Sequence, residues 1–284
     1  MDWSYLTLCI LNAHFSYTAT ILNIVTIYAI VKTSSLSKNF KTLLLSLAVS
    51  DLGVGLIAQP MFAAHIMDSK QNNKTMNNIA IYIAYRTPTS IFISASLFSV
   101  TALCADRYLA IYLHLRYQEL VTYKRVTIAV TSIWVFSALI SLLSFWIPTN
   151  IMFVYYVIQG FSCMITATFL NVKLKQTLRR HTTQIQIPQE AQNHQVESQR
   201  NRKSAMASLY VYLVFIVCYL PATCVLITIA TISEPTNDLQ HLILYTLTLV
   251  FLNSTLNPLI YCWKLKQIRK TVTGKLRDVF SRHT

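Results

Sequence analysis

Long apolar stretches separated by short polar segments run through the chain, and seven of them are long enough to cross a membrane. A transmembrane helix needs about 20 mainly apolar residues to span about 30 Å of hydrocarbon. The pattern therefore predicts an all-α fold, a single domain over residues 1–284 built as a seven-helix transmembrane bundle. The predicted spans are 6–31, 43–67, 79–112, 126–147, 151–174, 205–232 and 239–263.

The third span carries an Asp-Arg pair near its end, and Arg107 shares a helix face with residues along the whole span. Residues three and four positions apart share one helix face, and here they reach from one side of the membrane to the other. They are Thr89, Ile93, Ser96, Val100, Leu103 and Arg107. Ionisable groups in membrane helices are most often functional, so we expect a role for Asp106 and Arg107 beyond a position at the interface.

The second and seventh spans carry further polar residues at membrane depth. Asp51 has no Lys or Arg in its own helix, and a buried carboxylate without a partner is costly. Asn253, Asn257 and Tyr261 repeat every four residues around Pro258, so they share one face that we expect to point toward Asp51. Asn23 in the first span is compatible with a hydrogen bond between helices or with a chemical role.

Composition and charge agree with a membrane protein. The chain is 54% hydrophobic and 12% charged, with four glycines, which is too apolar for an ordinary soluble domain. The net charge is +14, yet all but three of the 24 Lys and Arg residues lie in segments that follow odd-numbered spans or at the ends of those spans; the exceptions are Lys70, Lys74 and Arg86. Basic residues concentrate on the cytoplasmic side, so we expect an extracellular N-terminus. The expected partner of this charge is anionic membrane lipid and not nucleic acid.

The segments outside the spans add four expectations. Too few residues precede the first span for a cleavable signal peptide, so we expect an uncleaved anchor. Asn73 begins an Asn-Lys-Thr sequon in an outer loop and is a candidate glycosylation site, although such motifs are frequent by chance. The six cysteines lie in or beside spans, so we expect no outer disulfide. Residues 264–280 predict an amphipathic helix on the inner leaflet, with apolar positions Leu265, Ile268, Val272, Leu276 and Val279.

Seven motifs, taken in chain order, resemble those of rhodopsin-like (class A) G-protein-coupled receptors, and together they cover nearly the whole chain. They are Asn23, LAVSD with Asp51, DRY at 106–108, Trp134, FIVCYLP at 215–221, NPLIY at 257–261 and the basic terminal helix. The pattern is nearest to melanocortin, cannabinoid, lysolipid and adenosine-like receptors, because Tyr82 stands where most members have a disulfide cysteine. The resemblance implies a plasma-membrane receptor, not an enzyme, that binds an extracellular small or lipid-like ligand and activates a heterotrimeric G protein.

The resemblance also implies site residues. A sodium pocket would use Asp51, Ser96, Asn253, Ser254 and Asn257. The G-protein switch would use Asp106, Arg107, Tyr108 and Tyr261, with Asp106 holding Arg107 at rest. Phe215, Tyr219, Pro221 and Pro258 would act as hinges, although the two aromatic residues are equally compatible with ordinary packing. The ligand pocket would be lined by Arg86, Thr89, Ser90, Ile93, Tyr219, Ala222, Thr223, Leu226, Leu247 and Phe251.

Departures from the family pattern bear on ligand and coupling. Thr89 replaces the aspartate of amine receptors, and Arg86 would suit an anionic head group or would simply extend to the outer interface. The fifth span lacks the usual proline and tyrosine, and Asn201 stands where many members carry a glutamate that pairs with Arg107. A receptor-like scaffold or decoy that does not couple is therefore the alternative function.

Other seven-helix or membrane classes fit less well. A retinal protein needs a Schiff-base lysine in the seventh span, and none occurs between 239 and 263, so we expect no retinal and no cofactor other than a sodium ion. Asp51 is the only carboxylate at mid-membrane, whereas an intramembrane enzyme would need a catalytic pair. A secondary transporter would show internal repeats, and we find none.

Overall fold

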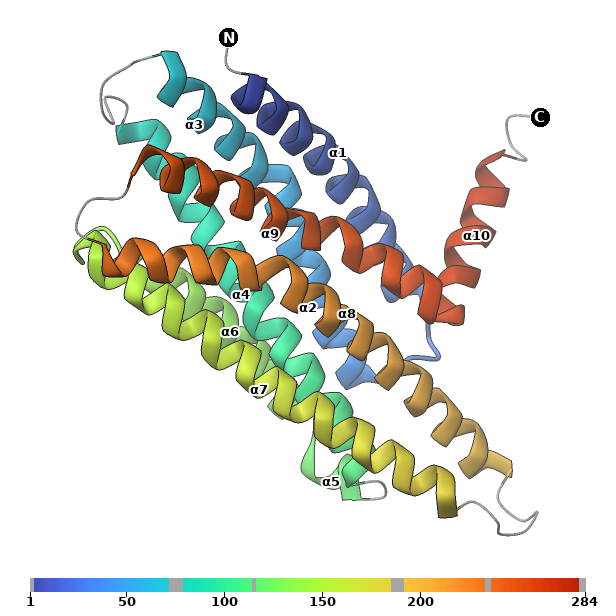
Figure 1. The fold of residues 1–284 in the computed structure, drawn as a ribbon. Coiled ribbons are helices and arrows are strands. Elements are labelled where there is room, and N and C mark those ends of the chain that lie inside the picture. Colours follow the sequence, from blue (N-terminus) through green and yellow to red (C-terminus); the bar gives the residue numbers. More distant parts are fainter. Residues whose placement is uncertain (1–2, 72–78, 114–115, 185–191, 233–235, 281–284) are drawn as a thin grey trace.

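The computed structural model describes residues 3–71, 79–113, 116–184, 192–232 and 236–280, and every regular element in these ranges is a helix (Figure 1). The elements, in chain order, are α1 Trp3–Lys32, α2 Lys38–Gly53, η1 Val54–Ala58, α3 Gln59–Gln71, α4 Ile79–Tyr112, α5 Tyr117–Leu120, α6 Tyr123–Leu143, α7 Thr149–Gln184, α8 Gln192–Thr231, α9 Asn237–Lys264 and α10 Lys266–Phe280. Seven segments are long and apolar enough to cross a membrane, with α2, η1 and α3 together forming one of them. The predicted all-α fold, with seven such helices and a short C-terminal one, is confirmed.

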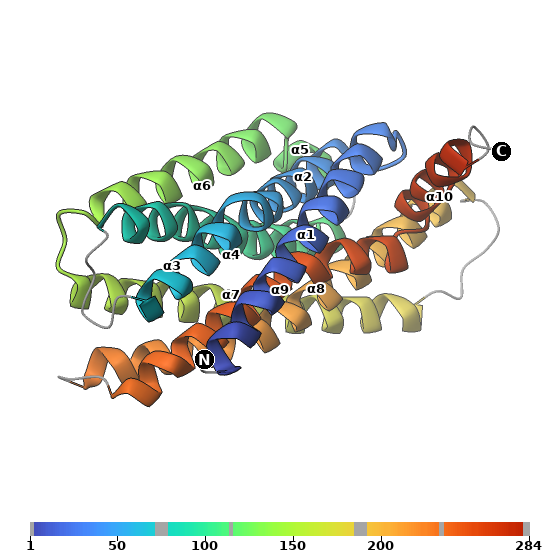
Figure 2. The same cartoon turned by 90° about the horizontal axis from the view of Figure 1, so that it is seen from above.

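The long helices lie side by side in an elongated bundle, and α4 runs through its centre (Figures 1 and 2). It contacts α2, α3, α6, α7 and α8, and the main apolar core includes Leu97, Val100 and Leu103 from its inner face. Small polar residues such as Ser94 and Ser99 are also buried on α4. Their hydroxyl groups have hydrogen-bond partners on α7 and α2, respectively.

Amide side chains connect α1 to α9 at two levels. Asn12 Nδ2 donates to Thr248 Oγ1 at 2.9 Å, and Asn23 Nδ2 donates to the carbonyl oxygen of Ser254 at 2.9 Å. Each amide also donates to a carbonyl one turn earlier in its own helix. Hydrogen bonds of this kind help to hold membrane helices together, because lipid tails are as apolar as the helix surfaces and the hydrophobic effect does not drive the helices together.

The second transmembrane segment is interrupted by the π-helical turn η1, which the sequence pattern did not predict. The backbone N–H of Gln59 donates to the carbonyl of Val54, five residues earlier, just before Pro60. Proline cannot donate this hydrogen bond, and a π turn rearranges the ladder around it. Gly53 and Gly55 bring neighbours close: a Cβ at Gly53 would lie 2.3 Å from the Phe92 ring, and one at Gly55 3.0 Å from the Thr20 amide.

A three-residue hydroxyl–indole chain joins α6 to the centre of the bundle. Trp134 Nε1 donates to Ser46 Oγ at 3.1 Å, and Ser46 lies 2.9 Å from Ser99 Oγ. Trp134 also packs edge-on against the Phe92 ring at 6.2 Å. Helices α2, α4 and α6 therefore share one polar contact inside an otherwise apolar interface.

The C-terminal helix α10 turns away from the end of α9 (Figure 1) and packs against α1 and α9. Leu265 and Ile268 are buried in the main core, and Val272 packs against it. Thr271 Oγ1 lies 3.1 Å from Thr33 Oγ1 on α1. Part of the apolar face expected to rest on lipid thus rests on the bundle, while the side chains of Leu276 and Val279 lie outside the described part of the helix.

Candidate functional site

A cavity of about 720 Å³ lies among α1, α3, α4, α7, α8 and α9, at the end of the bundle where α1 begins. Nine of the ten residues predicted for the ligand pocket line it: Arg86, Thr89, Ser90, Ile93, Tyr219, Ala222, Thr223, Leu226 and Leu247. Phe251 does not line it. This residue is fully buried and packs edge-on against Phe62, with 5.2 Å between ring centroids.

The cavity has basic and hydroxyl groups on its wall, and no carboxylate occurs among the described lining residues. Arg86, His65 and His241 supply the basic groups. The His65 ring stacks on Tyr85 at 4.5 Å, and His241 Nε2 lies 3.3 Å from the Tyr5 hydroxyl. Sequence reasoning missed both histidines and Tyr5, because they sit near helix ends where periodicity carries no information about which face looks inward.

Polar groups also line the deeper wall of the cavity, next to apolar side chains from α4, α8 and α9. Ser90 Oγ lies 2.8 Å from the Tyr156 hydroxyl, and Ser94 donates to Gln159 Oε1 at 3.3 Å. Thr89 Oγ1 and Gln159 Nε2 are buried and have no hydrogen-bond partner. Because buried polar groups are normally paired, these two atoms are available to a bound molecule.

A second polar cluster surrounds Asp51 in the middle of the bundle. Asp51 is fully buried, and its Oδ2 accepts a hydrogen bond from Asn257 Nδ2 at 2.8 Å. Ser96 on α4 and Ser254 on α9 also face this carboxylate. The structure thus brings Asp51 on α2 together with residues of α4 and α9 that the resemblance implied for the same pocket.

Several oxygen atoms in this cluster have no hydrogen-bond partner. They are Asp51 Oδ1, Ser96 Oγ, Asn253 Oδ1, Asn257 Oδ1 and the Tyr261 hydroxyl. Within the described ranges, no Lys, Arg or His forms an ion pair with Asp51, and no three His, Cys, Asp or Glu side chains gather as a transition-metal site would require. A buried carboxylate among neutral oxygens is a donor set that fits a hard cation such as sodium.

Arg107 lies at the opposite end of α4 and is buried, with 2% of its surface exposed. Its Nε donates to Asp106 Oδ2 at 2.9 Å, and its Nη2 contacts the same oxygen. The guanidinium carbon lies 4.1 Å from the centroid of the Phe40 ring on α2. The charge is therefore held by one carboxylate and one aromatic face, away from water.

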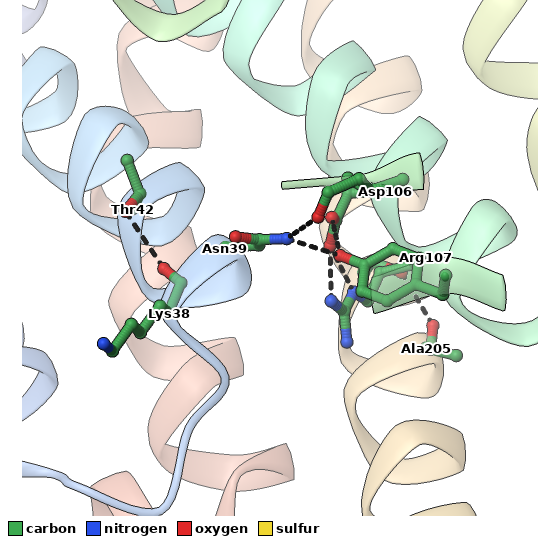
Figure 3. A network of polar contacts seen from close by, with 9 residues as sticks. Lys38, Asn39, Thr42, Asp106, Arg107 and Ala205 are labelled. Atoms are coloured by element: carbon green, nitrogen blue, oxygen red, sulfur yellow. Dashed lines mark hydrogen bonds and ion pairs between the residues drawn. The ribbon is translucent and has the colours of Figure 1, made fainter. Parts of the chain in front are cut away.

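Two residues that the motifs did not suggest complete this network. The Tyr117 hydroxyl on α5 donates to Asp106 Oδ1, and Asn39 Nδ2 donates to that hydroxyl at 3.3 Å and to the Val121 carbonyl at 2.6 Å. Figure 3 shows Asn39 pointing from α2 toward Asp106 and Arg107. Burial, and then the nearby Asp106 charge, raises the pKa of the Tyr117 hydroxyl, so it remains a donor at neutral pH.

The remaining predicted residues have these positions. The Tyr108 ring stacks on that of Tyr112, with 5.3 Å between the centroids. Phe215 and Tyr219 are buried with rings 4.9 Å apart. Pro221 and Pro258 lie inside α8 and α9. Asn73 and the side chains of Tyr82 and Asn201 lie outside the described residues.

Comparison with known proteins gives a consistent result. A profile described as 7 transmembrane receptor (rhodopsin family) matches residues 22–176 and 146–261. Melanocortin receptor 4 of Danio rerio is 28% identical over 269 residues, covering 88% of this chain and 77% of that protein. Melanocortin receptor 3 of Rattus norvegicus is 28% identical over 272 residues, covering 88% and 79%. Adenosine receptor A2a of Canis lupus familiaris is 26% identical over a 310-residue alignment, covering 98% and 73%.

Replacing Tyr117 with phenylalanine tests the network around Asp106. The loss of one hydrogen bond to a carboxylate should lower the free energy of unfolding by about 1 kcal/mol. The pKa of Tyr117 is raised in the folded protein, so its hydroxyl should contribute fully to stability below the pKa of an unfolded tyrosine, about 10. This contribution should be lost as the pH rises above that pKa. Thermal unfolding of wild type and Tyr117→Phe in detergent from pH 7 to 11 measures this difference.

The matched control is Tyr123→Phe, because Tyr123 is an exposed tyrosine at the start of α6. It should unfold like the wild type at every pH. A Tyr117→Phe variant as stable as the wild type at pH 7, or a stability difference that does not shrink above pH 10, would contradict the assigned role of this hydroxyl.

Proposed function

The chain belongs to the rhodopsin family of seven-transmembrane receptors, and on this premise we propose that it binds a small or lipid-like ligand from outside the cell and activates a heterotrimeric G protein. Its motif-based resemblance to that family is confirmed, and proteins of this family are receptors and not enzymes. The observation that carries the proposal is that one helix, α4, lines the cavity with Thr89, Ser90 and Ile93 and holds Arg107 at its other end.

The cavity chemistry favours a neutral or anionic ligand with an apolar body. Arg86 and two histidines stand on its wall, and guanidinium and imidazole groups can donate hydrogen bonds to an anionic or polar head group. Thr89 offers a hydroxyl where an amine ligand would need an acid. The apolar side chains of Ile93, Leu226 and Leu247 suit a hydrocarbon or ring system.

The proposed switch is release of Arg107. In the described conformation its guanidinium is bound by Asp106 and covered by Phe40, so it is not available to a partner protein. A ligand that binds more tightly to a conformation with Arg107 released would raise the population of that conformation. Tyr261, buried on α9 near the same end, and the prolines of α8 and α9 would allow these helices to rearrange.

We propose an orientation with the N-terminus outside the cell and α5, α10 and the α7–α8 connection inside. The supporting observation is the distribution of basic residues, since only Lys70, Lys74 and Arg86 lie on the opposite side. An epitope tag at the N-terminus should be stained in intact cells. A tag near Gln189 should be stained only after the cells are permeabilised. Staining of the Gln189 tag without permeabilisation would overturn the orientation and the receptor proposal with it.

Replacing Arg107 with alanine tests coupling. Basal nucleotide exchange on each class of purified G protein should be measured in membranes that contain wild type, Arg107→Ala or the exposed-site control Lys124→Ala. We expect wild type and the control to stimulate exchange equally, and Arg107→Ala to reduce stimulation at least about tenfold at equal surface expression. Undiminished stimulation in Arg107→Ala would refute the switch, and no stimulation by wild type with any G protein would favour the non-coupling scaffold.

A sodium ion in the Asp51 cluster is part of this proposal. Asp51, Ser96, Asn253, Ser254 and Asn257 would hold it, and the ion would supply a positive charge that offsets the buried carboxylate. An ion that binds the folded protein raises its stability with concentration. Thermal unfolding in detergent should therefore shift upward in NaCl relative to choline chloride of equal ionic strength.

The variant that tests the sodium site is Asp51→Asn, with Asp238→Asn as control because Asp238 is exposed at the start of α9. The sodium-dependent shift should disappear in Asp51→Asn and persist in Asp238→Asn. Equal sodium dependence in wild type and Asp51→Asn would exclude this cluster as the binding site.

A further inference from the structure

A second cavity, about 380 Å³ in volume, lies between α8 and α9 at the end of the bundle far from the ligand cavity. Its described lining consists of Arg202, Lys203 and Met206 from α8 and Lys264 from α9. The two helices run side by side in both views of the fold (Figures 1 and 2). Positive groups thus face one cleft from two transmembrane helices.

Lys264 is held in place by aromatic rings, and no acidic side chain in the described part of the chain pairs with it. Its Nζ lies 3.3 Å from the centroid of the Trp263 ring and 3.8 Å from that of Tyr210, and these two rings pack edge-on at 5.2 Å. A cation over a ring face is attracted but not neutralised. The ammonium charge is therefore positioned and still available, in contrast to that of Arg107, which Asp106 neutralises.

The α8 wall of the cleft has regular helical spacing. Lys203, Met206 and Tyr210 are three and four residues apart, so they lie on one face, with Arg202 next to it. Arg202 and Lys203 are exposed, and no carboxylate in the described part of the chain forms an ion pair with either of them. The cleft therefore concentrates three positive charges with no described counter-charge.

The depth of the cleft points to the head-group layer of the membrane. Trp263 is 60% exposed, and α9 ends one residue later, at Lys264. Exposed tryptophan next to lysine at a helix end is typical of the membrane–water interface. In the proposed orientation this interface belongs to the cytoplasmic leaflet, where the anionic lipids are found.

We propose that this cleft binds the head group of an inositol phospholipid that carries more than one phosphate. Three cations on two walls match several phosphate charges, whereas a lipid with a single net charge would leave two of them uncompensated. Basic clefts between transmembrane helices on the cytoplasmic side are suited to such head groups. The bound lipid would join α8 to α9, because each helix contributes cations.

Native mass spectrometry of the full chain in detergent tests this site. The added probes are phosphatidylinositol 4,5-bisphosphate, phosphatidylserine, phosphatidylcholine and soluble inositol 1,4,5-trisphosphate. Wild type should bind the bisphosphate lipid at least about tenfold more tightly than phosphatidylserine, and phosphatidylcholine more weakly still. The triple variant Arg202→Gln, Lys203→Gln and Lys264→Gln should weaken binding by about a hundredfold, since each cation near a lipid head group contributes about fivefold.

A second triple variant with the same change of charge provides the control: Lys38→Gln, Lys124→Gln and Lys175→Gln, at exposed positions on α2, α6 and α7. It should bind the bisphosphate lipid within about threefold of wild type. An equal loss of lipid affinity in both triple variants would show that general surface charge causes the binding, and it would overturn the proposed site. Binding of inositol trisphosphate as tight as that of the lipid would overturn the lipid assignment. The choice of leaflet rests on the proposed orientation, but binding in detergent depends neither on G-protein coupling nor on orientation, so failure of this site and failure of the proposed function are distinguishable.

Discussion

A charge inside a membrane protein must be compensated by the protein itself, because lipid offers no water, and this constraint organises the bundle. Asp51 and Arg107 are both almost fully buried, and each is surrounded by groups from other helices. Arg107 obtains a carboxylate from its own helix and an aromatic face from α2. Asp51 accepts a hydrogen bond from an amide of α9 and lies beside hydroxyl groups of α4 and α9. The compensating groups come from α2, α4 and α9, so these two charges connect the second, third and seventh transmembrane segments.

Much of the architecture follows from hydrophobic pattern alone, because spans must be long and apolar and basic residues must favour one side. Positions on one face, such as Asn253, Asn257 and Tyr261, also follow from helical period. The π turn η1 was not predicted, since the hydrophobic pattern carries no information about a local change in the backbone hydrogen bonds. Tyr117 was missed for a similar reason: it belongs to a short element without periodicity, and only the fold brings it to Asp106.

The cavity shows the same division between local pattern and tertiary structure. Residues of α4 and α8 that line it were expected from the resemblance to the receptor family, whereas His65, His241 and Tyr5 come from helix ends that meet only in the folded bundle. Phe251 was expected on the same ground, but it packs against Phe62 and does not line the cavity. A motif thus indicates which part of a helix lies near the pocket, and the packing of neighbouring helices decides which side chains line it.

The restraints on Arg107 come from α4, α5 and α2, and this has a consequence for α8. Asn201, on α8, is uncharged and cannot form the ion pair that a glutamate at this position would make with Arg107. The described contacts of the guanidinium are Asp106 and Phe40, neither of which belongs to α8. Movement of α8 would then not need to break an ion pair with α4, and an exposed pair is in any case worth only about 1 kcal/mol or less. A lipid bound between Arg202, Lys203 and Lys264 would act on this helix instead, through α9, so that the restraint on α8 would depend on the composition of the inner leaflet.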